Sequence, residues 1–233
     1  MSLGRILVAG ATGGIGRAVA ATLLRQGSQV LLHGRDPARL QALEEEAHHW
    51  GQAAAIAADL TQAEAVAQLH AQVARQPRLD AMVWCAGSFA RSEDPAVLAQ
   101  QLAANLLAPY ALIRALLPLL IEAHGQVVLL NSTQGLQVTA AGNTQFAATM
   151  HAMRAVADGL RQEVNEHGVR VVSVFLGSTA SARQARIHAM EGRAYRPEKL
   201  IQPDDVAEAV LGLLRLPRTV EATQITLRPM QKP

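Results

Sequence analysis

The feature that most limits the fold of this chain is a regular alternation between short apolar runs and longer segments with helical spacing. The apolar runs carry few polar residues, as expected for strands that are covered on both faces. Strands that alternate with helices of this length form parallel sheets, because each parallel connection must cross back over the sheet. We therefore predict an α/β fold, a doubly wound parallel sheet of about seven strands with helices on both faces. The predicted strands are Arg5–Ala9, Val30–Leu32, Ala54–Ala58, Ala81–Cys85, Gln126–Asn131, Val169–Phe175 and Gln224–Leu227. The predicted helices are Ile15–Gln26, Pro37–His49, Ala63–Ala74, Pro95–Ala123 (bent at Pro109), Gln145–Glu166 and Pro203–Arg215.

Composition and charge exclude several classes of function. Half of the 233 residues are hydrophobic, which allows a sizeable core, and the formal net charge is only +2. The basic residues are scattered, so we expect no nucleic-acid or anionic-lipid partner. Cys85 is the only cysteine and cannot form an internal disulfide. We find no signal peptide and no uninterrupted apolar stretch of about 18 residues, and therefore expect a cytoplasmic protein without a membrane span.

A glycine-rich turn, Gly10-Ala11-Thr12-Gly13-Gly14-Ile15-Gly16, joins the first predicted strand to the first predicted helix. Glycines permit a tight turn and let a pyrophosphate approach the backbone, while the helix N-terminus offers free N–H groups. Glycines alone are a weak signal, and an ordinary strand–helix turn is the plainer alternative. Because these glycines lie between a strand and a helix, we predict that the turn binds a dinucleotide diphosphate in a Rossmann-type fold.

The end of the next strand, His33-Gly34-Arg35-Asp36, indicates which dinucleotide is bound. The ribose 2′ position is read about 20 residues beyond the glycines. Asp36 precedes Pro37 at a predicted helix start, so its simplest role is to cap that helix. Arg35 then remains to face the adenosine, where a guanidinium suits a 2′-phosphate. The sequence therefore favours NADP over NAD.

One segment, Ser178–Gln202, breaks the alternation. At about 25 residues it is too long for an ordinary connection within a compact domain. It follows a predicted strand, and ligands of open α/β sheets bind outside the carboxyl ends of strands. We therefore predict a single dinucleotide-binding domain over residues 1–233, with an irregular substrate or lid loop at about 178–202.

Taken together, these features resemble the short-chain dehydrogenase/reductase family over nearly the whole length. The glycine turn is similar to the family's cofactor motif, Asp59-Leu60 to its adenine contact, and Cys85-Ala86-Gly87 to its Asn-Ala-Gly turn. Leu176-Gly177-Ser178-Thr179-Ala180-Ser181 resembles the Pro-Gly segment that covers the nicotinamide, with Leu in place of Pro. The cofactor-binding residues that this resemblance implies, together with Arg35, are Gly10, Thr12, Gly13, Gly14, Ile15, Gly16, Arg35, Asp59, Leu60, Cys85, Ala86, Gly87, Gly177, Ser178 and Ser181.

The resemblance also implies catalytic roles for Ser132 and Asn105, and it places Phe146 and Met150 where the family has a Tyr and a Lys. Shifting the alignment by one residue does not restore that pair. In the family the Tyr exchanges a proton with the substrate oxygen, and the Lys lowers its pKa and holds the ribose. Phe cannot transfer a proton, and Met can neither donate a hydrogen bond nor carry a charge. A positioned acid or base contributes about 10²- to 10⁴-fold in rate, whereas the phosphate contacts are independent of both residues.

Several groups could replace the missing acid. Ser132 with a bound water is the simplest candidate, although this serine could equally be a turn residue bonded to the backbone. His151, His188 and Tyr195 are further candidates, each more simply explained as a packing or surface residue. No metal site is predicted, since no convergent set of ligands is evident.

The two longest predicted helices, Pro95–Ala123 and Gln145–Glu166, are more apolar than one domain face requires. In the family such helices pair across a two-fold axis, so the resemblance implies a homodimer or homotetramer. Two functions remain open. One is an NADP(H)-dependent oxidoreductase acting on a small carbonyl or alcohol by a non-standard proton route. The other is a catalytically silent NADP(H)-binding sensor, scaffold or partner subunit. Ser132, Asn105 and the predicted lid loop favour the enzyme.

Overall fold

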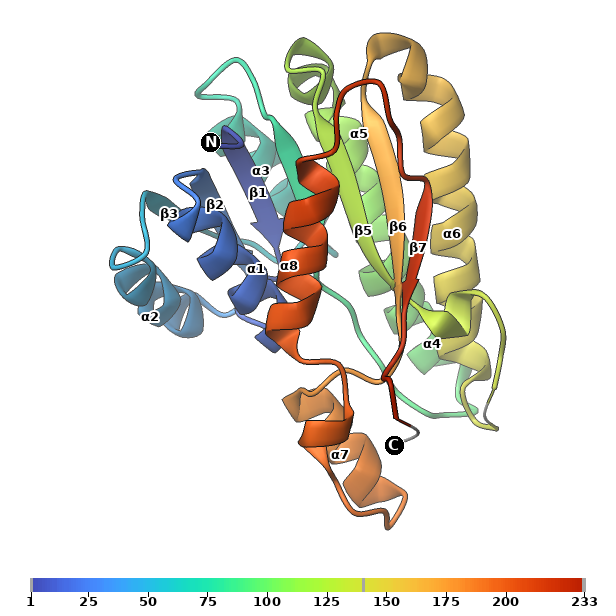
Figure 1. Ribbon diagram of the computed structural model, residues 1–233. Coiled ribbons are helices and arrows are strands. Elements are labelled where there is room, and N and C mark those ends of the chain that lie inside the picture. Colours follow the sequence, from blue (N-terminus) through green and yellow to red (C-terminus); the bar gives the residue numbers. More distant parts are fainter. Residues whose placement is uncertain (1, 140, 232–233) are drawn as a thin grey trace.

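A computed structural model describes residues 2–139 and 141–231 and contains a seven-stranded sheet in the order β3-β2-β1-β4-β5-β6-β7 (Figure 1). All of the neighbouring strand pairs are parallel, which confirms the predicted doubly wound α/β fold. The predicted strands agree with the observed ones to within two residues at each end. The strands are β1 (Arg5–Ala9), β2 (Gln29–Gly34), β3 (Ala53–Ala57), β4 (Ala81–Trp84), β5 (Gln126–Ser132), β6 (Arg170–Leu176) and β7 (Gln224–Leu227). The α-helices are α1 (Gly14–Arg25), α2 (Pro37–Ala47), α3 (Ala63–Val73), α4 (Pro95–Leu102), α5 (Ala108–Glu122), α6 (Thr144–Val164), α7 (Ala182–Met190) and α8 (Pro203–Leu214).

Helices cover both faces of the sheet. Figure 1 shows α1 and α8 in front of the strands and α3 and α5 behind them. Successive side chains of a strand point to opposite faces, so Ile6 and Val8 of β1 pack in the core beneath α1 and α8. Leu7 and Ala9 pack in the second core, beneath α3, α5 and α6. Because both faces are buried, the strands read as nearly continuous apolar runs.

The order of the strands reverses at β1. This strand pairs with β2 on one side and with β4 on the other, and the chain therefore winds outwards in two opposite directions. At such a switch point the connections leave on opposite faces of the sheet, and ligands of this kind of fold bind at the carboxyl ends of the two strands, a region that we call the crevice. The glycine-rich turn follows β1 directly, so the fold places it in this region.

The prediction that Ser178–Gln202 is an irregular loop was wrong, because this segment contains α7 and a 3₁₀ turn at Pro197–Lys199. Ser181 caps α7, and its hydroxyl accepts a hydrogen bond of 3.1 Å from the backbone N–H of Gln184. Of the residues within α7, His188 is the buried one. A short helix with so little buried surface has no clear apolar stripe, so its periodicity could not reveal it. Figure 1 shows α7 beyond the carboxyl ends of the strands, outside both helical layers.

The predicted helix Pro95–Ala123 has nearly the predicted extent, but it is not continuous α-helix. A π turn at Ala103–Leu107 separates α4 from α5. Pro109 has no backbone N–H for the carbonyl of Asn105, four residues earlier, so the α-helical ladder is interrupted at this point. The irregularity therefore precedes the proline rather than lying at it, and Asn105 lies within it.

The same span, Pro95–Glu122, is long and apolar enough to cross a membrane by length and composition, and 44% of its most apolar window is buried. One face of it packs against the sheet through side chains that are at most 3% exposed. These side chains are Ala108, Leu112, Ile113, Leu116 and Leu120. The span is therefore a core helix of this fold.

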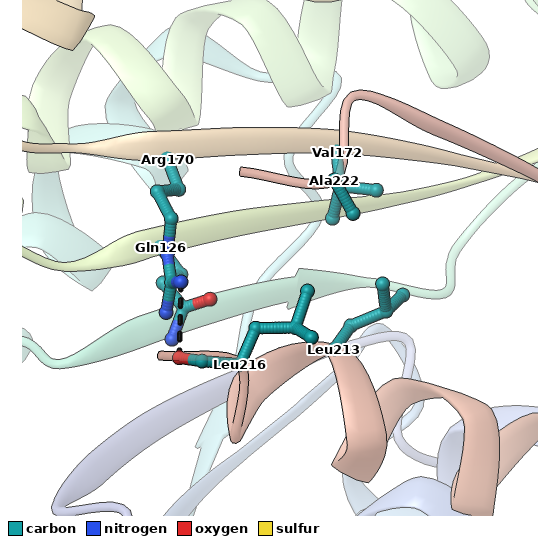
Figure 2. A pocket seen from close by; sticks show the side chains of 6 residues that line it. All are labelled: Gln126, Arg170, Val172, Leu213, Leu216 and Ala222. Atoms are coloured by element: carbon teal, nitrogen blue, oxygen red, sulfur yellow. Dashed lines mark hydrogen bonds between the residues drawn. The ribbon is translucent and has the colours of Figure 1, made fainter. Parts of the chain in front are cut away.

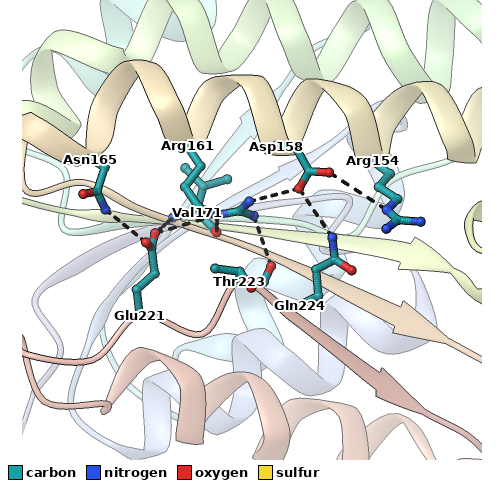
Figure 3. Close-up of polar contacts among 8 residues, drawn as sticks. All are labelled: Arg154, Asp158, Arg161, Asn165, Val171, Glu221, Thr223 and Gln224. Carbon is teal, nitrogen blue, oxygen red and sulfur yellow. Dashed lines mark hydrogen bonds and ion pairs between the residues drawn. The ribbon is translucent and has the colours of Figure 1, made fainter.

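The edge strand β7 is held to α6 by a buried arginine (Figure 3). Arg161 donates from Nε to the carbonyl oxygen of Val171 at 3.0 Å and from Nη2 to that of Thr223 at 3.1 Å. Its Nη1 pairs with Asp158 at 2.9 Å. Glu221 accepts a hydrogen bond from the backbone N–H of Val171, which closes the network. The guanidinium thus joins α6, β6 and the segment leading into β7.

We predict that Arg161→Leu lowers the free energy of unfolding by about 2–3 kcal/mol, because it leaves the buried carbonyl group of Val171 and the carbonyl group of Thr223 without their donor. Urea unfolding followed by circular dichroism measures the change. Arg154→Leu is the matched control, since this α6 arginine is 40% exposed and makes a 3.9 Å ion pair with Asp158. We expect it to change stability by no more than about 0.5 kcal/mol. Equal effects of the two substitutions would contradict the anchoring role of Arg161.

Candidate functional site at the carboxyl ends of β1, β4 and β5

The glycine-rich turn brings backbone against backbone. Gly10 has a positive φ of +82°, and a Cβ there would lie 2.6 Å from the backbone nitrogen of Ala86, after β4. A Cβ on Gly16 would overlap the carbonyl oxygen of Gly10. By contrast, a Cβ on Gly14 would meet nothing within 4 Å. Gly10 and Gly16 are therefore needed for the fold of the turn, whereas Gly14 borders open space at the start of α1.

The N-terminus of α1 lacks a side-chain cap. Its N-cap residue is Gly13, and its first turn contains no acidic residue. Asp36 and Asp94 cap the starts of α2 and α4 with their carboxylates. The first N–H groups of α1 thus keep their hydrogen-bonding capacity and the positive end of the helix dipole, which suits an anionic group. Open space at Gly14 and uncapped N–H groups fit a diphosphate bound at this turn.

Basic residues gather at the end of β2, near the same turn. Arg35 is exposed, and Asp36 caps α2 by accepting hydrogen bonds of 3.0 and 3.2 Å from the N–H groups of Ala38 and Arg39. The cap predicted for Asp36 is thereby confirmed. Arg39 was not singled out from the sequence, and its guanidinium donates to the carbonyl oxygen of Thr12 at 2.9 Å. Two arginines therefore lie beside the glycine-rich turn.

Sequence reasoning also missed His33, the residue that joins β2 to this turn and is 2% exposed. Its Nε2 lies 3.0 Å from the carbonyl oxygen of Ala58, and the N–H of Gly10 lies 3.4 Å from its Nδ1. These contacts suit the neutral ring, with the proton on Nε2. Burial lowers the pKa of His33, and the nearby Arg35 lowers it further. A histidine inside an apolar strand carries no sequence signal that separates it from an ordinary core residue.

Asp59 and Leu60, predicted to contact the adenine, follow β3. Asp59 is exposed and accepts hydrogen bonds from the N–H and hydroxyl of Thr61, at 3.1 and 2.8 Å, while Leu60 is 5% exposed. Burial raises the pKa of the Asp59 carboxyl, but the Thr61 hydrogen bonds and the nearby Arg35 hold it below its usual value. This carboxylate therefore remains charged beside Arg35 at neutral pH.

On the other side of the crevice, Asn105 ties three elements together. Its Nδ2 donates to the carbonyl oxygen of Ser88 at 2.9 Å and to the hydroxyl of Thr149 at 3.0 Å. Its Oδ1 accepts from the N–H of Ser88 at 2.6 Å. The π turn thereby connects the segment after β4 with α6.

Cys85 and Ala86 are half-buried and Gly87 is exposed, and burial raises the pKa of the Cys85 thiol to about 12, which keeps it protonated.

The end of β5 also contacts α6. Asn131 donates from Nδ2 to the carbonyl oxygen of Met150 at 3.0 Å. The neighbouring Ser132 accepts a hydrogen bond of 3.2 Å from the N–H of Gln134, so its hydroxyl caps the short 3₁₀ turn that follows. This is the geometry of the plainer role considered for Ser132, and it leaves the hydroxyl hydrogen available for a further bond.

The rings of Phe89 and Phe146 pack against each other close to where α6 contacts Asn105. Phe146 and Met150 are 8% and 7% exposed. The ring of Phe89, in the segment after β4, packs edge-to-face on Phe146 with the centroids 5.1 Å apart. Sequence reasoning missed Phe89, although the chain has only three phenylalanines and one of them lies two residues beyond the Ala86-Gly87 pair. The 146–150 stretch thus presents an apolar surface beside Asn105.

Residues 178–202, which we call the lid, cover the same edge of the sheet. Arg183 of α7 donates to the carbonyl oxygen of Gly87 at 2.6 Å. The phenol oxygen of Tyr195 accepts from the N–H of Ser181 at 3.1 Å, and His188 packs edge-on against Tyr195 at 5.5 Å. Of the predicted cofactor contacts in this region, Gly177 and Ser178 lie at the base of the lid, and Ser181 caps α7. Tyr195 and His188 therefore stabilise the lid internally.

Outside this cluster, a groove of about 510 Å³ runs along α1 and is lined by residues that include Arg17, Glu46, Trp50 and Asp204. A cavity of about 10 Å³ lies between the sheet and the end of α8, lined by Gln126 and Arg170 at the amino ends of β5 and β6 (Figure 2). It is too small for a substrate and lies at the opposite edge of the sheet from the glycine turn.

Across residues 2–139 and 141–231, no three His, Cys, Asp or Glu side chains gather as a metal site would require. His151, considered as a proton source, bonds back to the carbonyl oxygen of Ala147 at 2.9 Å.

Comparison with known proteins adds to this geometry. Residues 5–192 match the family described as short chain dehydrogenase. An uncharacterized oxidoreductase of Staphylococcus aureus (strain USA300) is 30% identical over 233 residues, which cover 96% of each chain. A solved metagenomic short-chain oxidoreductase in complex with NADP is 30% identical, with a TM-score of 0.84 over 99% of both chains. A putative short chain dehydrogenase from Escherichia coli CFT073, complexed with NADPH, is 29% identical, with a TM-score of 0.85 over 95% of both chains.

We predict that His33 makes the protein less stable in mild acid. Its pKa in the folded chain lies below the unfolded value of about 6.5, so the unfolded chain binds a proton that the folded chain excludes. Stability therefore falls as the pH drops through about 6.5, by up to about 1.4 kcal/mol for each further unit. Melting curves of the natural protein and of His33→Asn at about pH 7.5 and 5.5 test this. The variant should lose less stability between the two conditions, and an equal loss would show that His33 is not responsible.

Proposed function

This chain belongs to the short-chain dehydrogenase family, and we propose that it is an NADP(H)-dependent oxidoreductase acting on a small carbonyl or alcohol. The observation that supports this most directly is that the glycine turn and the polar cluster around Asn105 are connected by the short segment after β4. Gly10, in the glycine turn that leads into the uncapped start of α1, lies against the backbone of Ala86, and two residues further on Ser88 is bonded to Asn105. A diphosphate cradle and a polar cluster therefore share one crevice. In this proposal residues 1–233 form one dinucleotide-binding domain with a lid.

The residues that hold the cofactor in this proposal follow from the geometry of the turn. The N–H groups of Gly14, Ile15 and Gly16 bind the diphosphate, and Arg35, together with Arg39, binds a 2′-phosphate. Both relatives described above that were solved with a cofactor contain NADP or NADPH, which supports NADP over NAD. When bound, the nicotinamide supplies or accepts the hydride.

The polypeptide then has to position the substrate and manage one proton. We assign Phe146 and Met150 to the positions of the family's Tyr and Lys, where neither can exchange a proton at neutral pH. The hydroxyl hydrogen of Ser132 is free to bond the substrate oxygen, while its oxygen caps the turn. Asn105 acts by positioning, since its amide is engaged by Ser88 and Thr149. The proton in this scheme comes from water that reaches the oxygen held by Ser132.

A second function has an observation of its own. The buried rings of Phe89 and Phe146 fill the area beside Asn105 with apolar surface, and the Asn105 amide is occupied by protein groups. These features suit a protein that binds NADP(H) without turning it over, as a sensor, scaffold or partner subunit. The enzyme remains the preferred proposal, because such a protein has no use for a lid over the crevice.

We also propose a cytoplasmic homodimer or homotetramer formed through the two long helices. Leu107, the last residue of the π turn, and Tyr110, in the first turn of α5, are 59% and 46% exposed, although both are largely apolar. Self-association through a two-fold axis would cover such residues on both copies at once. Sedimentation of the purified protein measures the oligomeric state.

We predict that Gly14→Ala weakens NADPH binding at least about tenfold, or 1.4 kcal/mol, while leaving the fold intact. Its Cβ meets no protein atom within 4 Å but occupies the approach to the diphosphate. Fluorescence titration with NADPH measures the affinity. Gly159→Ala is the matched control, since a Cβ there also meets nothing and the residue lies on the far part of α6. It should stabilise the helix by up to about 1 kcal/mol and leave NADPH affinity unchanged. Unchanged affinity in Gly14→Ala would show that the diphosphate binds elsewhere.

We predict that Phe146→Tyr/Met150→Lys raises carbonyl reduction by about 10²- to 10⁴-fold, the usual contribution of a positioned acid. NADPH oxidation, followed by absorbance with a panel of small ketones and aldehydes, measures the rate for the natural protein, the double variant and both single variants. Turnover by the natural protein supports the enzyme. Turnover only after the double substitution supports the silent alternative. No turnover in any form, despite NADPH binding and a retained fold, would overturn the oxidoreductase proposal.

A further inference from the structure

We propose that the substrate of this site carries a carboxylate, and that Arg91 binds it in exchange for Glu191, a carboxylate of the lid itself. The inference rests on the proposed function, because it names the class of substrate that the crevice accepts. It adds a specificity-determining residue that lies outside the glycine turn and outside the Ser132–Asn105 cluster.

Arg91 lies beside the surface that the substrate has to contact. Its guanidinium carbon is 5.7 Å from the centroid of Phe89, whose ring forms the T-shaped pair with Phe146. Its Nε donates a 3.0 Å hydrogen bond to Oδ1 of Asn143, immediately before α6. The guanidinium is therefore fixed from both sides, by the segment after β4 and by the start of α6. Its side chain is 27% exposed, so the guanidinium is only partly enclosed by these contacts.

The guanidinium of Arg91 is paired with a carboxylate of the lid. Nη2 of Arg91 lies 2.5 Å from Oε1 of Glu191, at the end of α7, and Oε2 of Glu191 accepts a 2.6 Å hydrogen bond from Nε of Arg193. Burial raises the pKa of the Glu191 carboxyl, but its hydrogen bonds to both arginines hold the pKa below its usual value. Each oxygen of the Glu191 carboxylate is thus held by an arginine through a charge-assisted contact.

Exchange of one carboxylate for another explains why a lid residue makes this contact. Lid movement that admits a substrate separates Glu191 from Arg91, and a half-buried guanidinium without an anion is unfavourable. A substrate carboxylate restores the lost pair, whereas a neutral substrate does not. The exchange therefore favours anionic substrates over neutral ones of the same shape.

The net charge of the lid also favours anionic substrates. Residues 178–202 contain five cationic side chains and two carboxylates, a formal charge of +3 against +2 for the whole chain. These residues are Arg183, Arg186, Glu191, Arg193, Arg196, Glu198 and Lys199. The excess positive charge of the protein thus lies on the segment that covers the crevice, which attracts anions to its entrance.

Phenylglyoxylate and its neutral methyl ester are suitable probes. Both carry a ketone and a ring that can pack on the Phe89–Phe146 surface, and they differ in the carboxylate. Isothermal titration measures the affinity of each probe for the natural protein, with and without NADPH. We expect the natural protein to bind phenylglyoxylate at least about tenfold more tightly than the ester, the effect of one charge-assisted hydrogen bond.

Three variants separate exchange from a simple closing contact. Arg91→Met should abolish the preference for phenylglyoxylate and leave the affinity for the ester unchanged. Glu191→Gln should increase the affinity for phenylglyoxylate several-fold, because the competing internal carboxylate is gone. Arg186→Met is the control for overall charge, since this arginine of α7 is exposed, and it should change the preference by less than about threefold.

Equal affinity of the natural protein for the two probes, or a preference that survives Arg91→Met, would overturn the inference. Weaker phenylglyoxylate binding in Glu191→Gln would also overturn it, and would assign the pair to lid closure alone. Because binding is measured with and without NADPH, failure of the oxidoreductase proposal can be distinguished from failure of the carboxylate inference. In that case NADPH fails to bind or no ketone is reduced, while the Arg91-dependent preference can still be present.

Discussion

The architecture depends on one close approach of two backbone segments. Where the chain leaves β1, Gly10 turns with a positive φ and lies against the backbone of Ala86, leaving no room for a side chain. This contact joins the carboxyl ends of β1 and β4, the two strands at which the winding of the sheet reverses. The crevice, the uncapped start of α1 and the segment from Gly87 to Arg91 all take their positions from it. A bulkier residue at Gly10 would separate the two strands and with them the two halves of the site.

The parts of the fold that the sequence predicts are those encoded by neighbouring residues. Apolar runs covered on both faces indicated the strands, and helical spacing indicated most of the helices, since both signals repeat over a few residues. The cap at Asp36 was predictable because the Asp-Pro pair is a local helix-start signal, and the hydrogen bonds from Ala38 and Arg39 follow from it. The glycines of the turn were recognised from their place between a strand and a helix.

The parts that escaped prediction depend on contacts between distant residues. Phe89 packs on Phe146, 57 positions later, and no periodicity connects them. His33 resembles a core residue until its partners, Gly10 and Ala58, are known. The helix in the lid has too little buried surface to leave a pattern. The full engagement of Asn105 likewise required coordinates, because its partners come from two other elements.

The π turn before α5 has a consequence for how this long helix tolerates change. A π turn contains one more residue than the corresponding α-helical turn, and each residue of an α-helix advances by about 100°. The wider turn absorbs that residue, so deleting one residue between Ala103 and Leu107 would restore a continuous α-helix in which α4 and α5 keep their relative facing. The turn on which Asn105 is placed would be lost, and with it the position from which its amide reaches Ser88 and Thr149. Insertions and deletions within this turn are thus far less neutral than substitutions on its surface, and the geometry depends on the length of the segment as much as on its side chains.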